Sequence, residues 1–195
     1  MTLLRYSLLV CLLLSGRGAA QFFTTGQVDT FYFTPDSHLV VTALGGKGMV
    51  WQPGRPPQYP HRFWPEGDLW LSEAETPAAV FYLFGTCDAP SPQLWAAGYS
   101  LLHKQILLVR ILLAPDSTVQ TRPIAAKPVE ILNMREWGKY VFRIIFRKDT
   151  KEIQVEVNGV PLRVPFPVAL DSFSCFGYLV SRGTVRFEPF HFGGD

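Results

Sequence analysis

Residues 137–164 read WGKYVFRIIFRKDTKEIQVEVNGVPLRV, and this stretch decides the fold. Apolar side chains take alternate positions from Tyr140 to Phe146 and again from Ile153 to Val157. Successive side chains of a β-strand point to opposite faces, so each run has one face for a core. A polar turn separates the two runs, and Asn158-Gly159 supplies the positive backbone angles of a tight hairpin turn. The stretch therefore predicts a three-stranded antiparallel meander.

Turn residues divide the remaining sequence into further short strands. We expect an opening hairpin from residues 28–34 and 37–44, which ends in a turn at the glycine cluster 45–48. We also expect a closing hairpin, residues 175–190, around Arg182-Gly183, whereas residues 94–104 fit either a helix or a strand. Further strands are expected at 49–51, 69–72, 78–85, 106–113 and 128–132. This pattern predicts a single all-β domain, an antiparallel β-sandwich or jelly roll.

The first twenty residues have the pattern of a secretory signal peptide. Arg5 precedes a short apolar run, and Gly18-Ala19-Ala20 offers small residues for cleavage before Gln21. The apolar run is shorter than the ~20 residues that a membrane-spanning helix needs. We therefore expect a leader at residues 1–20 and a secreted, extracellular β-sandwich domain at residues 21–195, with no membrane span.

Charge and cysteine usage fit the same compartment. The chain has 18 Lys+Arg and 16 Asp+Glu, and loss of Arg5 and Arg17 with the leader leaves 16 of each. A net charge near zero gives no general attraction to nucleic acid. Cys11 would also leave with the leader, so an even pair remains, Cys87 and Cys175. An oxidising compartment favours a disulfide between them, and the alternative is two buried thiols.

Motifs for catalysis, cofactors and metals are not found. The four histidines are dispersed without metal-ligand spacing, and no G-x-S-x-G elbow occurs. The glycine cluster 45–48 is not followed by a helix, as a phosphate-binding loop would be, and carboxylate pairs such as Glu152 and Glu156 fit solvated strand faces. We therefore name no catalytic residue, no cofactor and no metal.

Aromatic residues are the better functional candidates. Residues 52–68 contain five prolines and two glycines, so we expect a long loop there without regular structure. Aromatic rings suit stacking on a sugar or gripping a protein partner. Trp51 and Trp70 lie next to strands, and we expect them to cap the core. The candidate ligand-binding residues are Tyr59, Phe63, Trp64 and Trp137.

The cationic face of the meander has two interpretations. Lys139, Arg143 and Arg147 share one strand face and could form a basic ladder for an anionic sugar. The favoured interpretation is cross-strand pairing with Glu152 and Glu156 of the next strand.

Two family resemblances follow from these motifs. The order of Trp137-Gly138, the strand that ends at Phe146, Asn158-Gly159 and the Gly183 strand resembles the C-terminal half of galectins. That resemblance implies a concanavalin-like jelly roll with Trp137 in a sugar site. The chain lacks the galectin His-x-Asn-Pro-Arg motif and has Tyr140 near the expected glutamate, so β-galactoside specificity is not implied.

The second resemblance covers residues 28–190. The opening TFYFTPDSHLVVTAL, the strand from Phe142 to Phe146 and the closing FGYLVSRGTVRF are similar to the farnesoic acid O-methyltransferase-like domain of invertebrate secreted and adhesive proteins. Both resemblances imply a β-sandwich. Because no cofactor-binding glycine loop and helix occur, the methyl transfer in the domain's name is not expected.

The sequence supports a secreted, non-catalytic β-sandwich that binds an extracellular glycan or protein. One alternative is a small extracellular enzyme, either a glycan-active hydrolase or the methyltransferase of the family name. Another is a carrier of an apolar small molecule, because residues 78–85 and 106–113 are long apolar runs.

Overall fold

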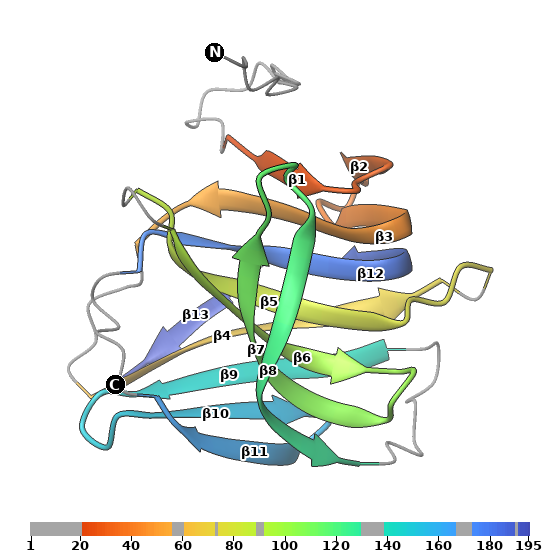
Figure 1. The fold of residues 1–195 in the computed structure, drawn as a ribbon. Coiled ribbons are helices and arrows are strands. Elements are labelled where there is room, and N and C mark those ends of the chain that lie inside the picture. The colour runs from red at the N-terminus through yellow and green to blue at the C-terminus, as the bar shows by residue number, and fades with distance from the viewer. Residues whose placement is uncertain are drawn as a thin grey trace.

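A computed structural model describes residues 21–55, 61–72, 74–88, 92–129, 139–166, 173–189 and 191–195. These residues form thirteen β-strands and no helix, so the expected all-β single domain is confirmed (Figure 1). The strands are β1 (Phe23–Gly26), β2 (Thr30–Phe33), β3 (Leu39–Pro53), β4 (Arg62–Leu71), β5 (Ala79–Thr86), β6 (Gln93–Ser100), β7 (Gln105–Leu113), β8 (Val119–Pro128), β9 (Lys139–Arg147), β10 (Glu152–Val157), β11 (Val160–Pro165), β12 (Cys175–Phe187) and β13 (His191–Gly194).

The strands form two layers packed face to face. The front sheet contains β1, residues 47–53 of β3, residues 175–181 of β12, β5, β6 and β7. The back sheet contains β2, the first part of β3, the last part of β12, β4, β9, β10 and β11, with β13 beside β4. Ring contacts join the layers, since Phe84 of β5 packs edge-on against Phe146 of β9 at 5.0 Å. This arrangement is an antiparallel jelly-roll sandwich.

Two long bent strands belong to both sheets, which corrects two predicted turns. β3 and β12 pair along almost their whole lengths, and their register shifts only between Ser181 and Gly183. Arg182 of β12 stands there opposite residues 44–46 of β3. The sequence predicted a turn at the glycine cluster 45–48 and another at Arg182-Gly183. Instead, each strand continues through a bulge, because a partner distant in sequence satisfies its backbone hydrogen bonds.

β4 corrects the predicted loop 52–68. Arg62–Leu71 is a strand with Phe63 and Leu69 in the core, paired to β9. The ladder to β9 skips Trp64 and Pro65 without changing register. Proline has no N–H to donate, so a strand tolerates it where the ladder is open. Proline and glycine at alternate inward positions hid this strand's hydrophobic alternation in the sequence.

The predicted meander is confirmed as β9, β10 and β11. Ile153 stands opposite Phe146, and Val157 lies opposite both Phe142 and Val160. Asn158 and Gly159 both have positive φ, 49° and 82°, as the turn requires. The ambiguous residues 94–104 are strand as far as Ser100, and the predicted strand at 106–113 is β7. Of the strand expected at 128–132, only Pro128 is strand, as the last residue of β8, and Val129 is not; residues 130–138 lie outside the described residues.

The β7–β8 hairpin (residues 105–128) curls over the outer face of the front sheet (Figure 1). Thr121 of β8 reaches Lys47 of β3, and a Cβ at Gly26 of β1 would lie only 2.6 Å from Val119. The hairpin buries a second apolar cluster, separate from the core between the sheets. This outer cluster consists of Met49, Ala79, Phe81, Leu83, Leu94, Ala96, Leu107, Val109, Ile111, Val119, Cys175 and Leu179.

A disulfide joins Cys87 to Cys175, as expected, with the Cα atoms 5.9 Å apart. It links the end of β5 to the start of β12 within the front sheet. Among the described residues, no helix is long and apolar enough to span a bilayer.

Candidate functional site

A groove of about 540 Å³ lies between the β7–β8 hairpin and the outer face of the front sheet. Its apolar lining includes five buried side chains of the outer cluster: Ala79, Phe81, Leu107, Val109 and Val119. Small-molecule sites in proteins usually have ~300–1,000 Å³ and combine an apolar lining with a few polar groups. The volume of this groove falls within that range, and its floor is apolar.

The rim of the groove is polar and comes from five separate segments. Gln27, Ser181, Gln105 and Thr121 contribute amide and hydroxyl groups. Lys47 is fixed from the opposite side, because its Nζ donates a 2.7 Å hydrogen bond to Thr121 Oγ1. This bond ties the hairpin to β3 and holds the two walls of the groove together.

Two cations border the groove, and no acid does so among the described residues. Lys47 lies on β3 and Arg182 in the bulge of β12, while the described lining contains no Asp or Glu. Burial lowers the pKa of Lys47, and the positive charge of Arg182 lowers it further. The groove is therefore an electropositive site.

The outer face of the back sheet carries a different arrangement. Arg143 Nε donates to Glu66 Oε2 at 2.6 Å, and Lys139 forms an ion pair with Asp68. These two cations do pair with carboxylates across neighbouring strands, as predicted. The partner strand was predicted wrongly, because the carboxylates belong to β4 and not to β10. Arg143 does stand opposite Glu156 in the ladder. The face is a neutralised charge ladder of ordinary cross-strand pairs.

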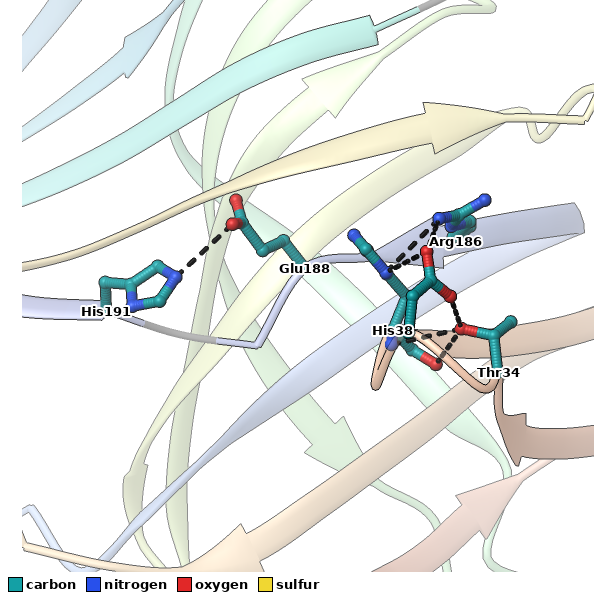
Figure 2. A network of polar contacts seen from close by, with 6 residues as sticks. Thr34, His38, Arg186, Glu188 and His191 are labelled. Carbon is teal, nitrogen blue, oxygen red and sulfur yellow. Dashed lines mark hydrogen bonds and ion pairs between the residues drawn. The ribbon is translucent and has the colours of Figure 1, made fainter.

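Trp70 also lies on the back face, and a polar network covers its ring. The Arg186 guanidinium is 5.0 Å from the ring centroid, and the His38 ring packs edge-on at 4.9 Å. Figure 2 shows Arg186, His38 and Thr34 converging on one cluster, in which Asp36 is the carboxylate. The Thr34 hydroxyl donates to Asp36 at 2.5 Å and lowers the pKa of that carboxyl. This cluster ties the β2–β3 turn to β12.

Glu188 and His191, also drawn in Figure 2, form a second pair at 3.3 Å beside this cluster. No group of three potential metal-ligating His, Cys, Asp or Glu side chains occurs in the described part of the chain.

The structure describes two of the four candidate aromatic residues, Phe63 and Trp64, and places their side chains on opposite faces of β4. Tyr59 and Trp137 lie outside the described residues. Phe63 is corrected, because its ring is 0% exposed and stacks on Phe146 at 4.6 Å, so it belongs to the core and cannot touch a ligand. Trp64 is half-buried on the outer face of β4, with the Arg62 guanidinium 5.5 Å from its ring centroid. Trp64 and the groove therefore lie on opposite faces of the sandwich.

Trp51 and Trp70 do not cap the core between the sheets. Trp51 packs against the outer cluster and stacks on Phe23 at 4.8 Å. The apolar runs that raised the possibility of a carrier, residues 78–85 and 106–113, pack into both hydrophobic clusters. A second cavity, lined partly by Phe22, Phe33 and Phe176, holds only about 110 Å³.

Sequence reasoning missed the groove residues Lys47, Arg182 and Thr121. Lys47 and Arg182 were assigned to turns, and Thr121 had no local signal. The groove exists only because the hairpin curls over the sheet and the β3–β12 bulge brings two distant segments together.

Comparisons with known proteins agree with this architecture. No family model and no curated protein sequence matches the chain. The carbohydrate-binding module CBM66 from Bacillus subtilis matches with 13% identity and a TM-score of 0.63, covering 91% of this chain and 98% of that one. The lectin UEA-II complexed with galactose matches with 12% identity and a TM-score of 0.56, covering 88% and 91%.

A protein of unknown function with a galectin-like fold from Bacillus subtilis matches with 11% identity and a TM-score of 0.54, covering 88% of each chain. At these identities the likeness shows the fold alone, which is the jelly roll of lectins and carbohydrate-binding modules. The resemblance to the farnesoic acid O-methyltransferase-like domain has no match here and stays a prediction.

Proposed function

We propose that the protein is a secreted, non-catalytic glycan-binding module that holds its ligand in the groove under the β7–β8 hairpin. The observation that carries the proposal is the groove itself, about 540 Å³ with an apolar floor and a polar rim. A sugar ring presents hydroxyl groups at its edges and C–H groups on its faces. Gln27, Gln105 and Thr121 match the hydroxyls, and Phe81 on the floor matches an apolar face.

Two further observations support this proposal. The fold is shared with a carbohydrate-binding module and with a lectin, which makes glycan the first ligand class to test. The leader pattern of residues 1–20 and the disulfide between Cys87 and Cys175 support secretion and a mature domain at residues 21–195.

A pair of tryptophan substitutions on the same strand tests the location. Thr121→Trp puts a large ring into the groove, whereas Gln120→Trp adds the same ring to the exposed side of β8. We expect Thr121→Trp to abolish binding on a glycan array and Gln120→Trp to leave it unchanged. Near-ultraviolet circular dichroism and a thiol assay check that both variants are folded and oxidised.

Trp64→Ala distinguishes a binding site in the groove from one at the aromatic residues predicted from the sequence. Loss of binding in Trp64→Ala with retention in Thr121→Trp would move the site to the back sheet and refute the groove. The wild-type protein could bind no glycan on the array and instead capture an extracellular protein, with this capture lost in Thr121→Trp. That result would show that the ligand of the groove is a protein and not a glycan.

A further inference from the structure

Lys47 and Arg182 are two like charges held at one end of the groove. Lys47 stands directly opposite Ser181 in the β3–β12 ladder, so Arg182 is the next residue along the partner strand. The pKa of Lys47 is lowered by burial and then by the charge of Arg182, so the two cations interact across the bulge. The fold therefore places two like charges close enough to repel each other.

No described carboxylate forms an ion pair with either cation. Ion pairs between described residues use the carboxylates Asp36, Glu66, Asp68, Glu188 and Asp195, and none of them involves Lys47 or Arg182. Within the described part of the chain, the Lys47 ammonium donates its side-chain hydrogen bond to the neutral hydroxyl of Thr121. Lys47 is half-buried and Arg182 is exposed beside it, and a bound anion would relieve the repulsion between these two cations.

The backbone conformation at Arg182 also supports a binding role for this residue. Six non-glycine residues in the described chain have positive φ, and five of them lie in turns between strands. Arg182, with φ 54°, is the one inside a strand. Few non-glycine residues adopt this conformation, and bulges of this kind re-aim side chains next to binding sites. The fold therefore holds a strained backbone at the position that carries a guanidinium to the groove.

We propose that the groove selects acidic glycans, with Lys47 and Arg182 binding a carboxylate or sulfate of the sugar chain. This inference rests on the proposed glycan-binding function and adds the ligand's charge. Arg182 can bind such a group with two parallel N–H bonds, whereas Lys47 acts as a point charge. Carboxylate and sulfate share this chemistry, and the experiment distinguishes them.

The test is calorimetric titration of the folded, oxidised protein at about 0.15 M salt, where long-range attraction is screened. The probes are dextran, dextran sulfate and hyaluronan, which are neutral, sulfated and carboxylated. We expect an acidic polymer to bind at least about tenfold more tightly than dextran. Strong binding of dextran sulfate alone assigns sulfate, and strong binding of hyaluronan assigns carboxylate.

Charge variants then locate the contact. Lys47→Gln/Arg182→Gln removes both groove cations, and Arg147→Gln/Lys151→Gln removes two cations from the far end of the back sheet. We expect the groove variant to lose about tenfold or more in affinity for the acidic polymer and the control to stay within about twofold. Because the groove variant relieves repulsion, we expect it to fold at least as stably as the wild type.

The outcomes keep the two proposals apart. Acidic binding that survives in the groove variant, or falls equally in the control, overturns the charge proposal. Neutral glycans that bind as tightly as acidic ones, and that Thr121→Trp excludes, leave the glycan-binding function standing and refute the acidic preference. Failure of every polymer and every array glycan to bind refutes both.

Discussion

The two outer faces of the sandwich differ in whether their cations have carboxylate partners. On the back sheet, Arg143 and Lys139 of β9 meet Glu66 and Asp68 of β4, so the charges neutralise each other across neighbouring strands. On the front sheet, Lys47 and Arg182 flank a groove whose described lining has no acid. A regular ladder places opposite charges side by side, whereas a bulge and an overlying hairpin separate cations from such partners. On the face with the irregular backbone, the groove cations have no ion pair with a described carboxylate.

The faces also differ in how they are covered. The back face is open, and β4 and β9 alternate buried with half-exposed residues. In the front sheet, the two strands β5 and β6 are buried on both sides, from Ala79 to Gly85 and from Leu94 to Ser100. Strands with two buried faces are apolar at every position, so the continuous run in β5 reflects the hairpin above it. Each prediction below compares the two faces.

The disulfide gives the largest expected difference, because it joins strands of the front sheet only. Its cysteines are 88 residues apart, and closing such a loop stabilises the fold by about 4–5 kcal/mol on the chain-entropy model. We expect Cys87→Ser/Cys175→Ser to lose most of that amount in urea unfolding. Hydrogen exchange should rise in β5 and β12 more than in β9 and β10. A uniform rise would mean that the sheets lose stability together.

Removing a side chain from under the hairpin gives the next largest effect. Ile111 is 4% exposed in the outer cluster, and a buried Ile→Ala change costs about 2–4 kcal/mol. The same truncation at half-exposed Val141, on the back face, should cost about 0.5 kcal/mol or less. Urea denaturation measures both. A small loss at Ile111 would show that the hairpin is weakly attached.

Removing one charge should change the free energy of unfolding in opposite directions on the two faces. Glu66→Gln leaves Arg143 without its ion pair, and we expect a loss of up to about 1 kcal/mol. Lys47→Gln relieves burial of a charge and repulsion from Arg182, so we expect no loss or a small gain. Urea midpoints at neutral pH test the pair. Destabilisation by Lys47→Gln would mean that its bond to Thr121 outweighs the repulsion.

The smallest expected effect is on the alkaline side. Since folding lowers the pKa of Lys47, the folded protein releases this proton first, and the unfolded chain holds more protons until pH passes about 10.5. Lys47 therefore contributes a rise in stability with pH in that window, and Lys47→Gln should lack it. Buried Tyr82, whose pKa burial raises, acts in the opposite direction in both proteins. The difference between their urea stabilities from pH 8 to 11 isolates the lysine.

The sequence predicted the parts of the fold that depend on local pattern. The meander follows from alternation in β9 and β10 and from Asn158-Gly159, all within one short stretch. The glycine cluster 45–48 and Arg182-Gly183 have local turn signals too, yet both lie inside strands. Their ladder joins segments more than 130 residues apart, and no local rule records such a partner.

The candidate site was less predictable for the same reason. Phe63 and Trp64 are adjacent in the sequence and were grouped, but consecutive strand positions face opposite ways, which puts one ring in the core and the other on the surface. Lys47, Arg182 and Thr121 come from β3, β12 and β8, and only the β3–β12 pairing together with the curl of the hairpin brings them to one groove.

The pairing of β3 with β12 also determines when the protein can fold during synthesis. β3 is among the first strands to leave the ribosome, while β12 and β13 are among the last. Both sheets therefore wait for β12, and until that strand is synthesised one edge of β3 lacks its partner. Such an edge needs protection from other nascent chains. Since Cys175 begins β12, the bond to Cys87 can form only after that wait, and its appearance marks the closing of the sandwich.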